Sequence, residues 1–346
     1  MPSKLPCRRL RPLTLLTLVT LGTIVLGLGG WQVWAQVKSK VMSKVGVVVE
    51  MPGKSFQGPL PELTLEQQRV RDQLQADLVE LARNIGERNL RHPVAYAESA
   101  KFMEDRLAAA GYTIRRQVYQ VKGRDCVNLE VEIKGAARAA EIVVIGAHYD
   151  SANGTAGAND NGSGAVSLLA LADLLKTLKP ERTLRFVAFA NEEPPYFQTE
   201  NMGSLVYAKE GQQRGNKIVA MLSLETMGYY DDTPNSQKYP PPFSRFYPTT
   251  GNFIGFVGNS ESAPLIKEVV GSFRRHAKFP AEGGAAPGNM EGVGWSDHWS
   301  FWQCGYQGSW SRTPRRFATH TITRTLTRPT KWTSPVSPGL WWDCVT

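Results

Sequence analysis

Acidic and imidazole side chains follow three short apolar runs of the sequence directly. His148 and Asp150 come after IVVIGA, the adjacent Glu192 and Glu193 come after LRFVAFA, and Glu225 ends the segment that begins IVAMLSL. A charged group at the end of a buried strand is costly unless another group compensates it. Carboxylates that converge on one cleft repel each other and attract cations. One imidazole with several carboxylate oxygens suits an open, catalytic zinc site better than a closed structural one.

A glycine-rich segment, GANDNGSGAV, carries a further acid, Asp160. Such a loop before a helix could bind phosphate through its backbone N–H groups. Asp160 would repel an anion, however, and no lysine follows it as in a phosphate-binding P-loop. Each of these motifs alone also fits a structural hydrogen-bonded pair, a solvated turn or a salt bridge. Their shared position at predicted strand ends favours a joint metal site.

The elements that must position these residues alternate along the chain. Strands are predicted at 113–121, 127–134, 142–147, 184–190, 218–224 and 253–258. Helices are predicted from Thr64 to about Ile85, then near 94–110, 162–177, 201–210 and 262–276. Nearly continuous apolar strands separated by helices indicate an α/β fold: a three-layer sandwich with a central, mostly parallel mixed sheet flanked by helices. In such sheets, ligands bind beyond the carboxyl ends of the strands, where the acidic residues fall.

Two local signals mark the ends of the first two helices. Thr64 and Gln67 have the spacing of a capping box, with Thr64 as the N-cap residue. Gly111 stands where a left-handed residue is expected to end the second helix.

The N-terminus has the layout of an export signal. Four basic residues precede an uncharged, largely apolar run from Pro12 to Val37. A helix needs ~20 such residues to cross a bilayer, so a retained signal anchor is the preferred interpretation. Val33-Trp34-Ala35 also fits a cleavage site, which leaves a secreted or periplasmic protein open. In either case the body of the chain is predicted to lie outside the cytoplasm.

The formal net charge of +9 lies entirely at the two ends of the chain. Residues 1–11 contribute +4 and residues 308–346 contribute +5, so the 296 residues between them are formally neutral. A neutral body with basic ends is poor evidence for a nucleic-acid-binding face, and no nucleic-acid partner is expected. The four cysteines form no CxxC pair, which argues against a structural zinc knuckle. Cys126 and Cys304 could pair in an oxidising compartment, but the sequence alone does not show that their Cα atoms lie close enough for a disulfide.

Five segments carry a resemblance to a known group of enzymes: GAHYDS, GANDNGSGAV, FANEEPPYFQTENMGS, LETMGYY and GWSDHWSFW. Together they resemble the zinc metallopeptidases of the co-catalytic aminopeptidase, glutamate carboxypeptidase and glutaminyl cyclase group. The resemblance runs from about residue 64 to Gln307. It implies two zinc ions and a peptide substrate.

The resemblance also implies a role for each site residue. Glu192 would be the general base, and Asp150 would orient a ligating histidine from outside the coordination shell. Asp297 and His298 would line the cleft without binding metal. The peptide bond between Asp160 and Asn161 would be cis. By this resemblance His148, Asp160 and Glu225 would hold the first metal ion, and Asp160 would bridge to a second ion bound by Glu193. The family usually has Asp in place of Glu225.

The chain departs from the family after Gln307. The family needs a last histidine, in a segment like Tyr-His-Thr, to complete the second metal site. Residues 308–346 instead hold nine Thr, six basic residues and one acid, without amphipathic periodicity. The codons that could encode this region also permit another protein sequence when they are read in a shifted frame. That sequence fits Met-Val-Thr-Asp-Thr-Ala-Pro-Phe, then Tyr-His-Thr, then Asp-Thr-Pro-Asp-Lys, which is the ending that the family should have. We therefore hypothesise a frameshift near Gln307, and His320 is not interpreted as a ligand.

The sequence thus predicts four parts: a signal peptide or signal-anchor helix at 1–37, a linker at 38–63, a zinc peptidase domain at 64–307 and an aberrant, disordered basic tail at 308–346. The predicted function is that of a zinc-dependent exopeptidase, impaired if the last histidine is missing. Two alternatives stay open, namely a glutaminyl cyclase-like acyltransferase and a non-catalytic binding domain. Neither the preferred residue nor the direction of cleavage follows from the sequence.

Overall fold

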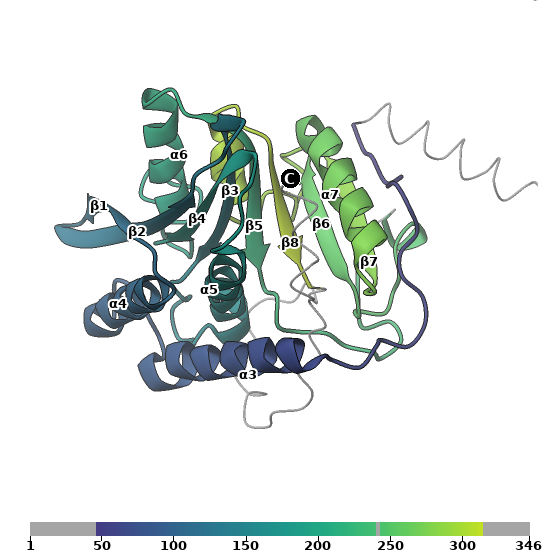
Figure 1. The fold of residues 1–346 in the computed structure, drawn as a ribbon, viewed down its shortest axis with the longest axis horizontal. Helices are drawn as coiled ribbons and strands as arrows, with labels where there is room; N and C mark the ends of the chain where they lie inside the picture. The colour runs from purple at the N-terminus through teal and green to yellow at the C-terminus, as the bar shows by residue number, and fades with distance from the viewer. Residues whose placement is uncertain (1–45, 240–242, 314–346) are drawn as a thin grey trace, which may run out of the picture. The chain divides into compact units, whose positions relative to one another are not determined.

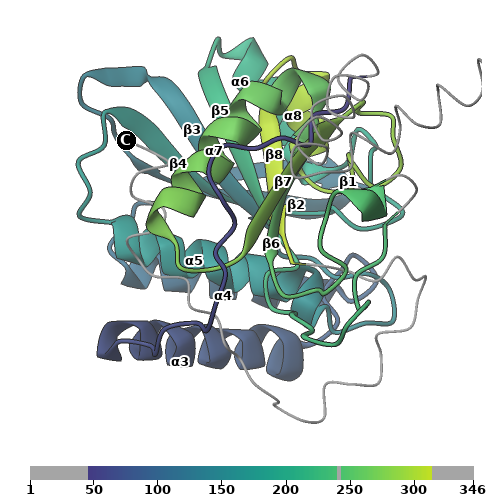
Figure 2. The same ribbon diagram turned by 90° about the vertical axis from the view of Figure 1, so that its right-hand side faces the viewer.

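One eight-stranded sheet runs through the part of the chain that the computed structural model describes, residues 46–239 and 243–313 (Figures 1 and 2). The strand order is β1–β2–β4–β3–β5–β8–β6–β7. The four central strands β4, β3, β5 and β8 run parallel, whereas β1, β2 and the β6–β8 pair add antiparallel contacts. The strands are β1 Arg115–Val121, β2 Arg124–Ile133, β3 Arg138–His148, β4 Arg182–Phe189, β5 Lys217–Glu225, β6 Ile254–Asn259, β7 Ala281–Ala286 and β8 Gly308–Arg312.

Helices cover both faces of this sheet. They are α3 Leu65–Val79, the π-helical turn Glu80–Ile85, α4 Pro93–Ala109, the π-helical turn Ala158–Ser163, α5 Gly164–Leu175, α6 Gly203–Gln213, two 3-10 turns at Phe243–Arg245 and Ser260–Ser262, α7 Ala263–His276 and α8 His298–Gln303. The predicted three-layer α/β architecture is confirmed. The six predicted strands and five predicted helices all exist, with ends displaced by a few residues.

The alternation of side chains along β3 explains why its apolar run is continuous. Val143 and Ile145 face one core, which they share with the buried side chains of α4, α5 and α7. Ile142 and Val144 face a second core under α6 and α8. Burying one such aliphatic side chain stabilises the fold by ~1.5–3 kcal/mol. The two cores therefore hold β3 rigidly from both sides, up to the last residue of the strand.

The two predicted helix-end signals are confirmed. The Thr64 hydroxyl accepts a hydrogen bond from the Gln67 N–H at 3.2 Å, and the Gln67 side chain accepts one from the Thr64 N–H at 2.9 Å. Gly111 follows α4 with a φ of +95°, a conformation that favours glycine. The capping box fixes the start of α3, and Gly111 fixes the end of α4 before the first strand.

The predicted boundary of the domain at Gln307 is wrong, because the chain continues directly into β8. This strand lies between β5 and β6 in the middle of the sheet, and Trp310 is 2% exposed. The sequence GSWSR has no apolar run, so it gives no strand signal. β7 was also missed, because its sequence AEGGAA contains small residues. A Cβ at Gly283 would lie 2.6 Å from the Val270 side chain, which explains why a small residue occupies that position.

The predicted linker at 38–63 is also packed over part of its length. Val47 is 3% exposed, and Val48 pairs with Ala285 through two backbone hydrogen bonds of 2.8 and 2.9 Å. The Ala281 N–H donates to the Ser55 hydroxyl at 2.9 Å. β7 is the last strand of the sheet, and its open edge offers backbone groups that an extended segment can satisfy. The compact unit accordingly begins at Val47 rather than at residue 64.

Other predictions lie outside the described residues. These are the export segment at 1–37, His320 and the tail beyond Thr313. Within residues 46–239 and 243–313, no helix is both long and apolar enough to cross a membrane.

The position of β8 predicts how truncated chains behave. A chain that ends at Gln307 should lose its cooperative unfolding transition, because β5 and β6 lose the strand that joins them. A chain that ends at Thr313 keeps β8 and should unfold cooperatively. Thermal unfolding followed by circular dichroism compares the two. A sharp transition for the shorter chain would contradict the assignment of β8 to the core.

Candidate metal centre

The carboxyl ends of three parallel strands bring the candidate ligands together. His148 is the last residue of β3, and Glu225 is the last residue of β5. Glu192 and Glu193 follow β4 by three and four residues. Because β3 lies between β4 and β5, the imidazole stands in the middle of the group. The structure thus brings the predicted residues together at one edge of the sheet, and their roles stay predictions.

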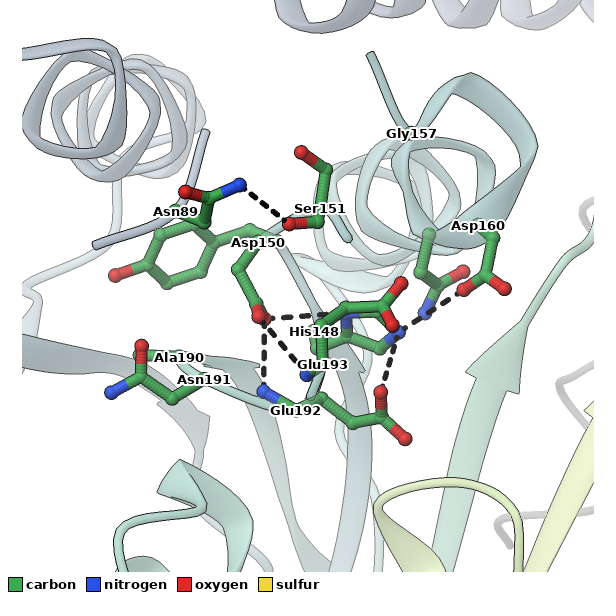
Figure 3. A network of polar contacts seen from close by, with 12 residues as sticks. Asn89, His148, Asp150, Ser151, Gly157, Asp160, Ala190, Asn191, Glu192 and Glu193 are labelled. Atoms are coloured by element: carbon green, nitrogen blue, oxygen red, sulfur yellow. Dashed lines mark hydrogen bonds and ion pairs between the residues drawn. The ribbon is translucent and has the colours of Figure 1, made fainter. Parts of the chain in front are cut away.

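Three carboxylates face the Nε2 atom of His148, and Figure 3 shows two of them, those of Asp160 and Glu192. The nearest oxygens lie at 3.3 Å for Glu225 and at 3.6 Å for both Asp160 and Glu192. The imidazole is fully buried, and neither ring nitrogen makes a hydrogen bond within the described residues. The described residues contain two sets of three candidate ligands, and within each set the ligand atoms lie within 4.8 Å of one another. His148 belongs to both sets.

The structure groups the predicted ligands differently from the grouping that the family resemblance implies. One set joins His148 with Asp160 and Glu225, as predicted for the first metal ion. The other set joins His148 with Glu192 and Glu193. Asp160 and Glu193, the predicted ligands of the second ion, therefore do not share a set.

Asp160 reaches the cluster through an unusual backbone segment. It lies in the turn Ala158–Ser163 with extended dihedral angles of −109° and 102°, and the Asp160–Asn161 peptide bond is cis. The side chain of Asn161 then ties this turn to β5. It donates to the Leu224 carbonyl at 2.8 Å and accepts from the Thr226 N–H at 3.0 Å. The sequence reasoning missed this role of Asn161, for which the only signal was its place beside Asp160.

Asp150 holds both β3 and the segment after β4. Its two carboxylate oxygens accept the backbone N–H groups of Glu192 at 3.0 Å and Glu193 at 3.1 Å. One of these oxygens also lies 3.3 Å from Nδ1 of His148 (Figure 3). A carboxylate in this position orients the ring and directs its other nitrogen toward the cluster.

A serine that the sequence reasoning did not identify supports Glu225. The Ser296 hydroxyl donates to a Glu225 carboxylate oxygen at 3.0 Å and lies 2.9 Å from the Ser223 hydroxyl. The hydroxyl pair thus joins β5 to the loop that precedes α8. This places the GWSDHWSFW motif against the cluster.

Asp297 and His298 belong to neither set of candidate ligands, and of the two only Asp297 interacts electrostatically with His148 and Glu225. Nε2 of His298 lies 2.8 Å from the Val293 carbonyl, and the ring stacks on Trp310 with a centroid distance of 5.4 Å. Burial lowers the pKa of His298 to about 3, so the ring is neutral and packed. Burial raises the pKa of Asp297 to about 7. Both residues are fully buried, and their predicted role as cleft wall stays a prediction.

Burial and mutual repulsion dominate the electrostatics of the cluster. Burial raises the pKa of Glu192 well above its usual range, and the charges of Glu193 and Glu225 raise it further. Burial and the negative charge of Asp160 likewise raise the pKa of Glu193 well above its usual range. Burial lowers the pKa of His148, but the surrounding carboxylates outweigh it and hold that pKa well above its ordinary value.

This donor set fits a divalent cation. A buried imidazole nitrogen without a hydrogen bond is surrounded by hard carboxylate oxygens, a combination that zinc accepts in catalytic sites. A cation would also offset the repulsion that raises the pKa of the glutamates.

Comparison with known proteins agrees with this geometry. The family model of Peptidase family M28 matches residues 128–335, which is more than half of the chain. The chain belongs to this peptidase family. The match spans the carboxyl ends of β3, β4 and β5 and continues past Gln307.

Two curated relatives match this M28 chain over part of their length. The uncharacterised protein YfbL of Escherichia coli is 34% identical over 214 residues, which cover 59% of this chain and 65% of YfbL. Leupeptin-inactivating enzyme 1 of Streptomyces exfoliatus is 29% identical over 181 residues, which cover 51% of this chain and 40% of that enzyme. The chain thus spans less than two thirds of either relative.

The fold is also that of a solved aminopeptidase. The zinc aminopeptidase BSAP from Bacillus subtilis superposes with a TM-score of 0.56 at 13% identity, and the match covers 72% of this chain and 86% of BSAP. At 13% identity, this similarity shows a shared fold and nothing further.

The contacts of Asp150 predict an effect on metal binding. An Asp150→Asn substitution should weaken zinc binding ~10–100-fold, because one of the two acceptor oxygens becomes an NH₂ group that cannot accept. Competition with a chromophoric chelator measures the affinity. The exposed Asp125→Asn change is the control and should have no effect. Wild-type affinity in D150N would show that Asp150 does not support the site.

Proposed function

We propose that this M28 family chain is a zinc-dependent, aminopeptidase-like exopeptidase that hydrolyses peptide bonds. The observation that carries the proposal is the buried imidazole of His148, faced by three carboxylates. Those of Glu192 and Glu225 lie at the ends of parallel strands, and that of Asp160 lies in the turn before α5. Family membership supports a peptide substrate. The fold of a zinc aminopeptidase agrees with it.

His148, Asp160 and Glu225 would hold one zinc ion, and Glu193 would contribute to a second. Zinc bound there would polarise the scissile carbonyl and lower the pKa of a bound water. The last histidine that the family uses at the second ion has no counterpart among the described residues. We propose that this chain therefore binds the second ion weakly, and that a tail restored to the other reading frame would raise zinc stoichiometry and activity together.

Glu192 is the proposed general base. The residue is 6% exposed, and its carboxylate lies 3.6 Å from Nε2 of His148. Asp150 accepts a hydrogen bond from its backbone N–H. A base in this position can take the proton of the attacking water and deliver it to the leaving amine. The raised pKa of Glu192, caused by burial, brings the carboxylate closer to the pH at which such a proton must be exchanged in both directions.

An apolar pocket near the cluster supports a preference for substrates with an apolar side chain. It has a volume of 140 Å³ and lies on the face of β6, β7 and β8. Thr313 lines its rim and donates a backbone hydrogen bond to Thr226, one residue beyond Glu225. Aromatic and aliphatic side chains form most of the lining, among them Tyr239, Phe243, Tyr247, Phe253, Val257 and Trp310.

Export is part of the proposal. Residues 1–37 would serve as a signal peptide or signal anchor, and the peptidase domain would act outside the cytoplasm. Glutaminyl cyclisation and non-catalytic binding are the competing functions. Turnover of a leucine anilide excludes a pure cyclase, and zinc in the purified protein excludes a metal-free binding module.

Removing the general base gives the sharpest kinetic prediction. Glu192→Gln should lower kcat for a leucine anilide by ~10²–10⁴-fold, because no group then takes the water proton. Zinc content should stay at the wild-type level, which elemental analysis checks. Glu200→Gln, with a side chain that is 77% exposed, is the control and should keep full activity. Wild-type kcat in E192Q would exclude Glu192 as the base.

Filling the pocket should change substrate binding alone. Val257→Phe places a ring in the 140 Å³ cavity and should lower kcat/KM for a leucine substrate ~10-fold or more, since ~1.4 kcal/mol of lost contact corresponds to tenfold. Val118→Phe on the outer strand β1, where Val118 is 53% exposed, serves as the control. Unchanged kcat/KM in V257F would separate this pocket from the substrate site.

A further inference from the structure

Arg88 is a fully buried cation in the segment between α3 and α4. A buried charge is costly unless it is paired or hydrogen-bonded. Burial lowers the pKa of Arg88 only to about 10, so the guanidinium stays charged at neutral pH. The proposed mechanism does not use this charge.

The guanidinium donates hydrogen bonds to carbonyl groups from three separate segments. Nε donates to the Tyr149 carbonyl at 2.5 Å, and Nη2 donates to the Gly157 carbonyl at 2.8 Å. Nη1 donates to the carbonyls of Gly86 and Ala156. These acceptors are backbone groups, so the side chain fixes the path of the main chain.

Two of these segments carry the candidate ligands. Tyr149 stands between His148 and Asp150, and Gly157 precedes Asp160 by three residues. Arg88 therefore joins the end of β3 to the turn that delivers Asp160. Gly157 has a φ of +52°, and a Cβ there would lie 3.3 Å from Nη2 of Arg88. The loop is thus folded closely around the guanidinium.

Backbone contacts strengthen the same junction. The Arg88 N–H donates to the Ser151 hydroxyl, and the Ser151 N–H donates to the Arg88 carbonyl, both at 3.0 Å. Asn89, the next residue, donates to the Ser151 carbonyl at 3.1 Å (Figure 3). The segment 86–89 therefore holds the ligand-bearing loop at several points.

We propose that Arg88 is a positioning residue that sets the distance between His148 and Asp160 and thereby the metal affinity of the centre. Arginine is needed because its planar fork directs several donors in fixed directions, whereas lysine has one compact ammonium group. The inference depends on the proposed zinc centre but adds a residue that touches neither metal nor substrate.

The test measures zinc affinity of the full chain by chelator competition, together with the absorption spectrum of the cobalt form. Arg88→Lys keeps the charge but cannot reach all four carbonyls, so zinc binding should weaken ~10–100-fold, the usual effect of losing an outer contact. The cobalt spectrum should shift, because the ligand geometry changes. Neither readout depends on activity.

The control is Arg106→Lys. Arg106 also makes a double hydrogen bond, to the buried Asp77 at 2.9 Å for both contacts, but it joins α4 to α3 away from the cluster. R106K should lower the melting temperature and leave zinc affinity and the cobalt spectrum unchanged. An equal loss of affinity in R106K and R88K would overturn the inference, because the effect would then be general destabilisation.

Other outcomes are equally decisive. Wild-type affinity and spectrum in R88K overturn the role of Arg88 and leave the proposed function intact. No zinc binding by the wild-type chain overturns the proposed function itself. If R88K does not fold, Ser151→Ala decides: it removes one contact of the same junction and should weaken zinc binding several-fold, and an unchanged affinity contradicts the inference.

Discussion

The repulsion among buried carboxylates around one imidazole is the constraint on which the site depends. Glu192 and Glu225 are less than a tenth exposed, and both approach the same nitrogen of His148. Water cannot screen these charges as it does at the surface. A cation bound between the oxygens would offset this repulsion. Hydrogen bonds of Asp150, Asn161 and Ser296 also hold the neighbouring groups.

The layered sheet makes this concentration of charge possible. Both faces of β3 are buried, so its end is fixed by packing rather than by the ligands. The cluster then forms from residues that are far apart in sequence but follow adjacent strands. Arg88 adds a positive charge beside the same loop, and it is bound by backbone carbonyls instead of by the acids. Because the guanidinium of Arg88 is bound by backbone carbonyls, the cluster carboxylates are left to face His148.

The sequence predicted the parts of the fold that carry a strong pattern. The apolar runs before His148, Glu192 and Glu225 identified three of the four central strands, and the capping box at Thr64 identified a helix start. It did not predict β7 or β8, because the short sequences AEGGAA and GSWSR have no hydrophobic period. The ligand candidates were recognised from their types, whereas the supporting contacts of Arg88, Asn161 and Ser296 depend on tertiary distances that no local pattern encodes.

Thermal unfolding of the purified chain with increasing zinc tests the central claim most directly. A ligand that binds only the folded state stabilises it by ~2.7 kcal/mol at 100 times its dissociation constant. The melting temperature of the wild-type chain should therefore rise with zinc, and His148→Ala should remove most of this rise. A melting temperature that does not respond to zinc, or an equal rise in the two proteins, would contradict the assignment of this cluster as the metal centre.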